Sequence, residues 1–133
     1  AVSSPASAVA QAAAATAVDA DPSIAHSMVA AFLRRRNAMH ASLSKVPGIN
    51  LNLPMGAFYL FPDVSELFGK SFNGKSLDNS DDVAMFLIEE AHVATVSGAA
   101  FGTPECIRIS YAAADEVLEE AVRRIEAAIS KLV

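Results

Sequence analysis

Residues 93–111 constrain the fold of this chain more than any other stretch. They read as two short strands joined by a turn over residues 97–102 that contains two glycines. Side chains alternate between the two faces of a strand, so residues 106–111 divide into two sets. One face carries Ile107, Ile109 and Tyr111, and the other carries Cys106, Arg108 and Ser110. The chain must therefore bury the first face, and it holds a permanent positive charge on the second.

Arg108 is the candidate binding residue of this strand. A guanidinium fixed among β-branched neighbours matches a carboxylate or a phosphate, because its fork can donate two parallel hydrogen bonds. Alternation alone leaves two other possibilities open: Arg108 faces solvent on a one-sided sheet, or it pairs with an acid of its own chain. Cys106, the single cysteine, excludes an internal disulfide, and we expect it to be a small packed residue.

The remaining sequence predicts an α+β fold, with a small, mostly antiparallel sheet covered by helices on one side. An alanine-rich helix over residues 6–18 is expected to be buried, because its side chains are small and largely apolar. A long helix from Pro22 to about Lys45 carries an apolar stripe at helical spacing, and this stripe is expected to lie in the core. The stripe comprises Ile24, Met28, Val29, Phe32, Leu33, Met39, Leu43 and Val46.

Shorter elements follow. Residues 49–53 alternate as a half-buried strand, and the apolar run 57–61 predicts a buried strand in which Phe58 and Tyr59 pack in the core. Residues 67–79 read as a mobile surface loop, and Ser80 as the N-cap of the next helix. The final helix begins near Asp115, with an apolar face and two predicted ion pairs. These pairs are Glu119 with Arg123, and Glu120 with Arg124.

Composition narrows the classes of partner. The chain has 133 residues, 53% of them hydrophobic, and a net charge of −5. The only basic cluster is Arg34, Arg35 and Arg36, expected to be mostly solvated, so nucleic acid is a poor partner. The three histidines are too widely spaced for a compact metal motif, and residues 6–18 are too short to span a membrane. We expect neither a metal site nor a membrane span.

Three motifs resemble class I pyridoxal-phosphate aminotransferases: residues 97–112, 56–61 and 32–36. The resemblance is nearest to the C-terminal part of the aspartate/prephenate aminotransferase branch, a homodimeric fold-type I family. It implies that Arg108 binds the α-carboxylate of the amino-acid or oxo-acid substrate, with Gly56 and Phe101 near the active site. It also implies that residues 1–20 are the terminal helix of a large cofactor domain and residues 21–133 the small domain.

The resemblance assigns the chemistry to the rest of a longer enzyme. The sequence begins at Ala1 instead of methionine, and none of Lys45, Lys70, Lys75 and Lys131 lies in the family's Schiff-base motif. We therefore expect pyridoxal 5'-phosphate in the intact parent, supplied by a missing large domain of the same chain. The isolated chain is expected to hold no catalytic or cofactor-binding residue and to be inactive. The substrates would be aspartate or glutamate with a 2-oxo acid or prephenate, in a plastid stroma or a bacterial cytoplasm.

Two positions depart from the family pattern. Ser97 stands where the family normally has proline, which removes a φ constraint from the turn, and Asn37 stands where it usually has aspartate. Two other functions remain open on the residues alone: a stand-alone α+β ligand-binding or interaction module, and the small domain of a fold-type I lyase.

Overall fold

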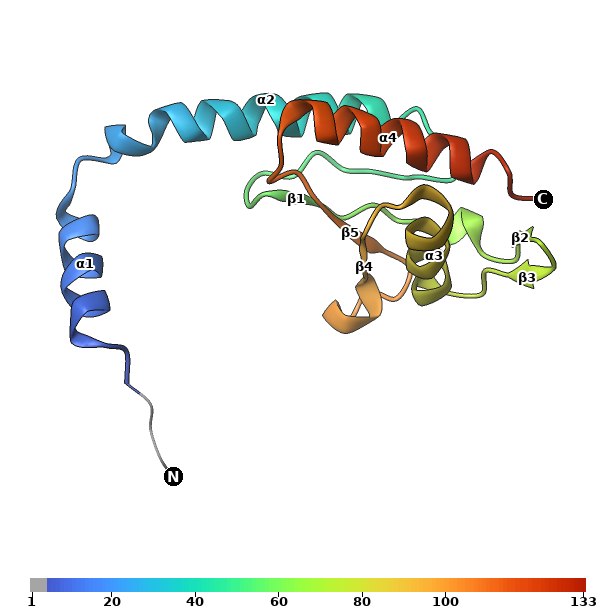
Figure 1. The fold of residues 1–133 in the computed structure, drawn as a ribbon, viewed down its shortest axis with the longest axis horizontal. Helices are drawn as coiled ribbons and strands as arrows, with labels where there is room; N and C mark the ends of the chain where they lie inside the picture. Colours follow the sequence, from blue (N-terminus) through green and yellow to red (C-terminus); the bar gives the residue numbers. More distant parts are fainter. Residues whose placement is uncertain (1–4) are drawn as a thin grey trace. The chain divides into compact units, whose positions relative to one another are not determined.

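The computed structural model describes residues 5–133 and divides them into two compact units, of which the first ends at Ala31 and the second is Phe32–Val133 (Figure 1). The first unit contains helix α1, Ala8–Asp19, and a 3-10 turn, Pro22–Ala25. Helix α2, His26–Leu43, begins there and continues into the second unit. The second unit holds every strand that the described residues form.

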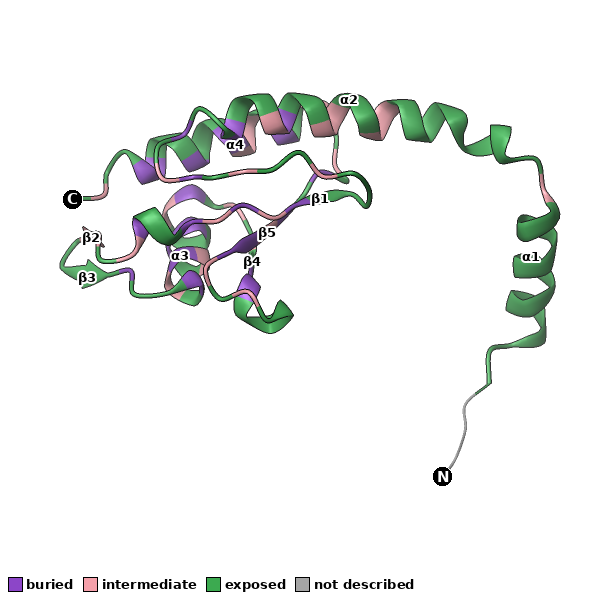
Figure 2. Ribbon diagram, turned by 180° about the vertical axis from the view of Figure 1, so that it is seen from behind, coloured by how far each residue is buried: buried purple, intermediate pink, exposed green. Residues whose placement is uncertain are grey.

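Helix α1 forms where alanine predicts it, but it is not buried. Ser7 caps it by accepting a 3.2 Å hydrogen bond from the Ala10 N–H. None of its residues is buried, and Val9 and Val18 are largely exposed (Figure 2). The expectation of a buried helix is therefore wrong for this chain. Alanine favours the helical backbone but removes little apolar surface from water, so helix propensity does not determine packing.

Helix α2 confirms only part of its predicted core stripe. Asp21 caps the preceding 3-10 turn through a 2.8 Å hydrogen bond from the Ser23 N–H, with Pro22 next in the chain. Met39 and Leu43 are buried, whereas Ile24 and Met28 are exposed. Val29 and Leu33 are exposed as well. The periodic pattern continues through the whole helix, but only its C-terminal part has a core to face.

The central sheet has three antiparallel strands in the order β1-β5-β4 (Figure 1). Strand β5, Ile107–Ser110, lies in the middle, between β1, Tyr59–Leu60, and β4, Val96–Ser97. Tyr59 pairs with Ser110, and Val96 pairs with Arg108. The strand expected over residues 57–61 is therefore shorter, and Phe58 and Tyr59 are exposed instead of packed in the core.

The alternation predicted for the central strand is confirmed. Ile107, Ile109 and Tyr111 are all buried in one hydrophobic core, to which helices α2 and α4 contribute (Figure 2). Helix α4 spans Asp115–Ile129. Cys106 on the opposite face is buried too, and burial raises the pKa of its thiol, with the Asp63 and Glu105 carboxylates raising it further. This thiol is a packed residue with little thiolate character, as expected.

Two segments, one before β1 and one after it, differ from expectation. Residues 49–53 form no strand, since their only ladder contact is an isolated bridge between Asn50 and Asp63. Residues 67–79 are not an irregular loop: they contain a hairpin of β2, Ser71–Phe72, and β3, Lys75–Ser76. Alternating hydrophobicity marks a half-buried extended segment, but a strand also requires a partner with free backbone groups.

Helix α3, Ser80–Phe86, continues into a π-helical turn, Leu87–Ala91. Its N-cap is Asn79, whose side chain accepts hydrogen bonds from the N–H groups of Asp81 and Asp82. The assignment of Ser80 as the cap is therefore wrong. Asparagine and serine both cap helices, so two adjacent candidates cannot be separated by residue type.

In helix α4 one glutamate pairs with two arginines, in place of the two separate pairs that were predicted. Glu120 accepts hydrogen bonds from both Arg123 and Arg124, each at 2.7 Å. Hydrogen bonds from Arg123 and then Arg124 lower the pKa of Glu120 from 4.5 to about 2. The predicted Glu119–Arg123 pair is wrong, because Arg123 donates to Glu120 instead.

Candidate functional site

Arg108 lies at the second position of the central strand, on the face opposite the core. Its side chain is partly buried, between buried Ile107 and Ile109 in the chain. The strand holds its backbone by pairing with Val96 of β4. A central strand is among the most rigid supports in a fold, so the guanidinium projects from a well-defined base.

Two aromatic rings hold the guanidinium. The guanidinium carbon of Arg108 lies 4.8 Å from the ring centroid of Phe101 and 5.5 Å from that of Tyr59. A guanidinium over an aromatic face is stabilised electrostatically, and two such contacts restrict its movement. The rings cover part of the guanidinium but form no hydrogen bonds with the N–H groups along its edge. The edge remains available for hydrogen bonds to an anion.

No acid of the described residues forms an ion pair with Arg108. The possibility that this arginine pairs with a carboxylate of its own chain therefore fails for residues 5–133. It is also not a fully solvated side chain, because it is partly buried against Phe101 and Tyr59. Arg108 is therefore a partly buried guanidinium in contact with two aromatic rings, without an ion-paired acid among residues 5–133.

The turn before the central strand supports Phe101. Residues Gly98–Phe101 form a 3-10 turn that ends at Gly102, whose φ of 78° is in the left-handed region. Gly98 is tightly enclosed: a Cβ atom there would overlap the carbonyl oxygens of Thr103 and Cys106. The Gly98 N–H donates a 2.7 Å hydrogen bond to the Cys106 carbonyl oxygen. Both glycines are therefore required by the geometry that carries Phe101 to Arg108.

Gly56 is not joined to this cluster. A Cβ atom on Gly56 would meet no other atom within 4 Å, so Arg108 does not reach it. The next residue, Ala57, adopts a φ of 61°, and its carbonyl oxygen accepts a hydrogen bond from the Tyr111 hydroxyl. Of the two residues expected near the active site, Phe101 lies against Arg108 and Gly56 lies in the open turn before β1.

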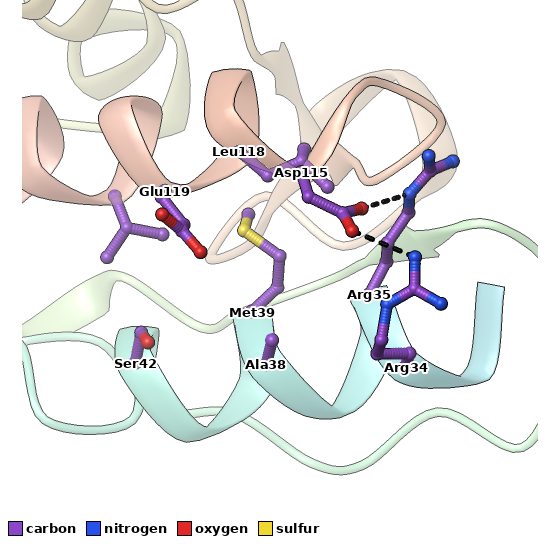
Figure 3. Close-up of a pocket in the computed structure, with 9 residues that line it drawn as sticks. Arg34, Arg35, Ala38, Met39, Ser42, Asp115, Leu118 and Glu119 are labelled. Carbon is purple, nitrogen blue, oxygen red and sulfur yellow. Dashed lines mark hydrogen bonds and ion pairs between the residues drawn. The ribbon is translucent and has the colours of Figure 1, made fainter. Parts of the chain in front are cut away.

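The arginine cluster of α2 contrasts with Arg108. Arg34 and Arg35 both donate to Asp115 at the start of α4, at 2.8 Å and 2.6 Å (Figure 3). Arg36 donates to the Pro54 carbonyl oxygen. The expectation of a mostly solvated cluster holds for Arg34, whose side chain is 61% exposed, and fails for Arg35, whose side chain is only 25% exposed. Hydrogen bonds from Arg35 and then Arg34 lower the pKa of the Asp115 carboxyl.

Asn37, which departs from the family pattern, makes a polar contact with Arg36. Its side-chain oxygen accepts hydrogen bonds from the Arg36 Nε and Nη2 atoms, at 3.1 Å and 2.9 Å. An amide oxygen presents the same acceptor geometry as a carboxylate oxygen without the negative charge. Asn37 therefore holds Arg36 through neutral-acceptor hydrogen bonds and forms no ion pair with it.

A pocket of about 140 Å³ lies between α2 and α4, beside these ion pairs (Figure 3). Met39 and Leu118 form part of its apolar wall, and Arg34, Arg35 and Asp115 line its rim. The two rim arginines are already engaged by Asp115, and Arg108 does not line the pocket. This pocket is therefore a separate feature from the Arg108 cluster.

The sequence offers Arg108 and Phe101 as candidate site residues and predicts Tyr59 in the core, whereas the structure places the Tyr59 ring against Arg108. The register of β1 against β5 decides that contact, because it places Tyr59 opposite Ser110, two residues from Arg108. No sequence signal specifies this register. In the part of the chain that the structure describes, no group of three or more His, Cys, Asp or Glu residues could hold a metal ion. None of the helices there has the length and apolarity needed to cross a membrane.

Comparisons with known proteins agree with the fold. The model of the family "Aminotransferase class I and II" matches residues 1–125. An aspartate aminotransferase of Streptomyces avermitilis is 43% identical over 115 residues, covering 86% of this chain and 28% of that protein. A bifunctional aspartate aminotransferase and glutamate/aspartate-prephenate aminotransferase of Petunia hybrida is 43% identical over 103 residues, covering 77% of this chain and 22% of that protein.

A solved structure resembles almost the whole chain. The crystal structure of the aspartate aminotransferase from Rhizobium meliloti superimposes with a TM-score of 0.88 at 36% identity, covering 96% of this chain and 32% of that one. The chain thus spans about a third or less of the length of these proteins. The family model covers nearly the entire sequence, and the α+β fold agrees with it. The chain belongs to the class I and II aminotransferase family.

Proposed function

We propose that this chain is the substrate-carboxylate-binding part of an aminotransferase, in which Arg108 binds the α-carboxylate of the amino acid and of the oxo acid. The observation that carries the proposal is the state of Arg108: a partly buried guanidinium, clamped by Phe101 and Tyr59, with no acid partner among residues 5–133. A carboxylate fits the fork through two charge-assisted hydrogen bonds.

The chemistry of the site follows from the ring-covered side of the guanidinium and from its open edge. The rings of Phe101 and Tyr59 exclude water from part of the cation, which strengthens its attraction for a carboxylate. The rigid strand and the two rings also orient the fork before substrate arrives, so less conformational entropy is lost on binding. The role of Arg108 is to bind and orient the substrate through the N–H donors of its guanidinium.

The rest of the enzyme supplies the cofactor. Pyridoxal 5'-phosphate acts as the electron sink of transamination and is held by a lysine Schiff base. The residues of this chain do not fit that group: Lys131 is paired with Glu90, and Lys45 and Lys75 are exposed. Lys70 is only partly buried, so none of the four lysines lies in the desolvated pocket that activates a Schiff-base lysine. We therefore place the cofactor outside this chain.

In this proposal residues 1–20 are the terminal helix of the large cofactor domain, and residues 21–133 form the small domain. The exposed apolar side chains of α1 support the first assignment, since a helix with Val9 and Val18 in water gains stability by docking. The parent would act as a homodimer on aspartate or glutamate with a 2-oxo acid or prephenate. Plastid stroma and bacterial cytoplasm are the proposed compartments, because relatives occur in a plant and in bacteria.

The test compares Arg108 variants in the complete polypeptide with its cofactor. We expect Arg108→Ala to lower kcat/KM for aspartate by about 10- to 100-fold or more, since a charge-assisted pair is lost. Arg108→Lys should recover little, because an ammonium cannot reproduce the fork. Arg123→Ala is the matched control, because Arg123 is an exposed arginine engaged only with Glu120 among the described residues. Near-normal kinetics for both Arg108 variants would remove Arg108 from the site.

A further inference from the structure

Two buried serines join helix α3 to the turn that carries Phe101. The hydroxyl oxygens of Ser80 and Ser97 lie 2.9 Å apart, and the two residues are only 1% and 9% exposed. The Ser97 hydroxyl oxygen also accepts a 3.2 Å hydrogen bond from the Ala99 N–H. Ser97 is thereby the N-cap of the 3-10 turn Gly98–Phe101. Ser80 is the first residue of α3 and is not its cap, so its hydroxyl is free to serve this contact.

The path from Ser97 to the candidate site is short. The 3-10 turn begins after Ser97 and ends on Phe101, whose ring lies 4.8 Å from the guanidinium carbon of Arg108. The enclosed backbone of Gly98 fixes one side of the turn. The other constraint is the hydroxyl pair, because it ties the start of the turn to α3. A change in the orientation of Ser97 therefore alters the position of the Phe101 ring over the cation.

The backbone of Ser97 has the conformation of a proline. Its φ is −57°, close to the value of about −65° that a pyrrolidine ring imposes. Hydrogen-bonded and non-hydrogen-bonded pairs alternate along an antiparallel ladder. The Gly98 N–H donates to the Cys106 carbonyl oxygen, so Gly98 and Cys106 form a hydrogen-bonded pair. The preceding pair, Ser97 with Ile107, is therefore a non-hydrogen-bonded one. The Ser97 N–H accordingly points away from β5. A proline would lose no ladder bond at this position.

We propose that Ser97 and Ser80 are positioning residues for the Arg108 site, in which a buried hydroxyl pair supplies the restraint on the turn that a proline would otherwise supply. The inference rests on the proposed function of Arg108 and deepens it. Ser97 touches no substrate: it acts through Phe101, which restricts the guanidinium. The pair also explains why two hydroxyls are buried together beside an otherwise apolar core.

The test separates positioning from stability with variants of the complete enzyme. In Ser80→Ala/Ser97→Ala both hydroxyls are absent, so neither serine is left buried without its partner, and the Ala99 N–H loses its acceptor. In Ser80→Ala/Ser97→Pro the hydroxyls are equally absent, but φ is fixed by the ring. These two variants differ mainly in the restraint on the turn. Phe101→Leu, alone and combined with the double alanine variant, tests whether the effect passes through the ring.

The double alanine variant is expected to raise the KM for aspartate and lower kcat/KM about five-fold, with kcat changed less, because the ground-state grip on the carboxylate weakens. The alanine/proline variant is expected to stay within about two-fold of the wild type, since the turn regains its restraint. In the Phe101→Leu background, the double alanine change should have no additional effect. A matching loss of kcat/KM in the alanine and proline variants overturns the inference, as does additivity with Phe101→Leu.

Arg108→Ala, measured in parallel, distinguishes this inference from the proposed function. If Arg108→Ala is strongly impaired while the double alanine variant has wild-type kcat/KM, the serine inference fails alone. If Arg108→Ala has wild-type kcat/KM, the proposed function fails and this inference fails with it. If Arg108→Ala and the double alanine variant both lose kcat/KM and the alanine/proline variant recovers it, the proposed function and this inference are both supported.

Discussion

The hydroxyl of Tyr111 donates a 2.9 Å hydrogen bond to the carbonyl oxygen of Ala57, 54 positions earlier in the chain. Tyr111 is buried at the end of the central strand, and Ala57 lies in the turn before β1. Burial raises the pKa of Tyr111, opposed by the charge of Arg36, so the phenol stays protonated and remains a donor at neutral pH. The contact thus joins the turn before β1 to the strand that carries Arg108.

Tyr111→Phe removes this hydrogen bond and leaves the Ala57 carbonyl without its side-chain partner. We expect the free energy of unfolding to fall by about 1 kcal/mol, the usual net contribution of such a bond. Urea denaturation measures the change. Tyr59→Phe is the control, because the Tyr59 hydroxyl makes no hydrogen bond among the described residues and its ring remains on Arg108. Equal stabilities for the two variants would show that the Tyr111 bond contributes nothing.

Ala57→Gly should stabilise the protein. Ala57 adopts a φ of 61°, a region in which a Cβ atom is strained and glycine is not. Relief of that strain is expected to raise the free energy of unfolding by up to about 1 kcal/mol, reduced by the greater freedom of glycine in the unfolded chain. Ala94→Gly is the control, since Ala94 is exposed and has no positive φ. Urea denaturation measures the change. An unfolding midpoint for Ala57→Gly below that of Ala94→Gly would show that Ala57 is not strained.

The Asp115 ion pairs should make stability depend on acid pH. Hydrogen bonds from Arg35 and Arg34 lower the pKa of Asp115 in the folded chain. Its contribution is therefore complete above the unfolded carboxyl pKa and is lost as the pH falls through the lower, folded value. Asp115→Asn should lower the thermal midpoint at pH 7 and change it little in strong acid.

The control for Asp115→Asn is Glu116→Gln. Glu116 is also in the first turn of α4, but no ion pair involves it among the described residues. Both changes remove one favourable interaction with the helix dipole. Only Asp115→Asn also removes the contacts with α2, so its loss at pH 7 should be larger. Identical pH profiles for the two variants would count against an effect of the arginines.

Helix α1 should be poorly protected in the isolated chain. It has 12 residues, none of them buried, and an isolated helix of this length is marginal in water. We expect its amide hydrogens to exchange rapidly, whereas those of α4, which has five buried residues, should exchange slowly. Hydrogen exchange followed by NMR compares the two helices within one sample. Equal protection would show that α1 is packed in solution.

The isolated chain should bind no cofactor. Purified residues 1–133, mixed with pyridoxal 5'-phosphate, are expected to show no absorbance band from a specific lysine Schiff base, because none of Lys45, Lys70, Lys75 and Lys131 is buried. Absorbance titration gives the measurement, with the complete polypeptide as the positive control. A band that saturates at one cofactor per chain would contradict this assignment.

The sequence predicted the features that depend on local order. Alternation identified the buried face of the central strand, with Ile107 and Ile109 in the core and Arg108 opposite them. The prediction failed where several partners were possible. Glu120, not Glu119, pairs with Arg123, and Asn79, not Ser80, caps α3. In each case two neighbouring residues could make the same contact, and the structure uses the one that was not predicted. Residue type is the only information that the sequence provides at those positions, and it does not separate the two.

By itself, the sequence determined the fold class, the helix-forming segments and which side of the central strand carries the cation. These follow from backbone propensity and from the two-residue period of a strand. Only the tertiary structure decided what surrounds Arg108: the register that brings Tyr59 near it, the turn that places Phe101 over it, and the pairing of Arg34 and Arg35 with Asp115. Such contacts join residues far apart in the chain, and their geometry depends on the packing of the whole domain, which no local pattern encodes.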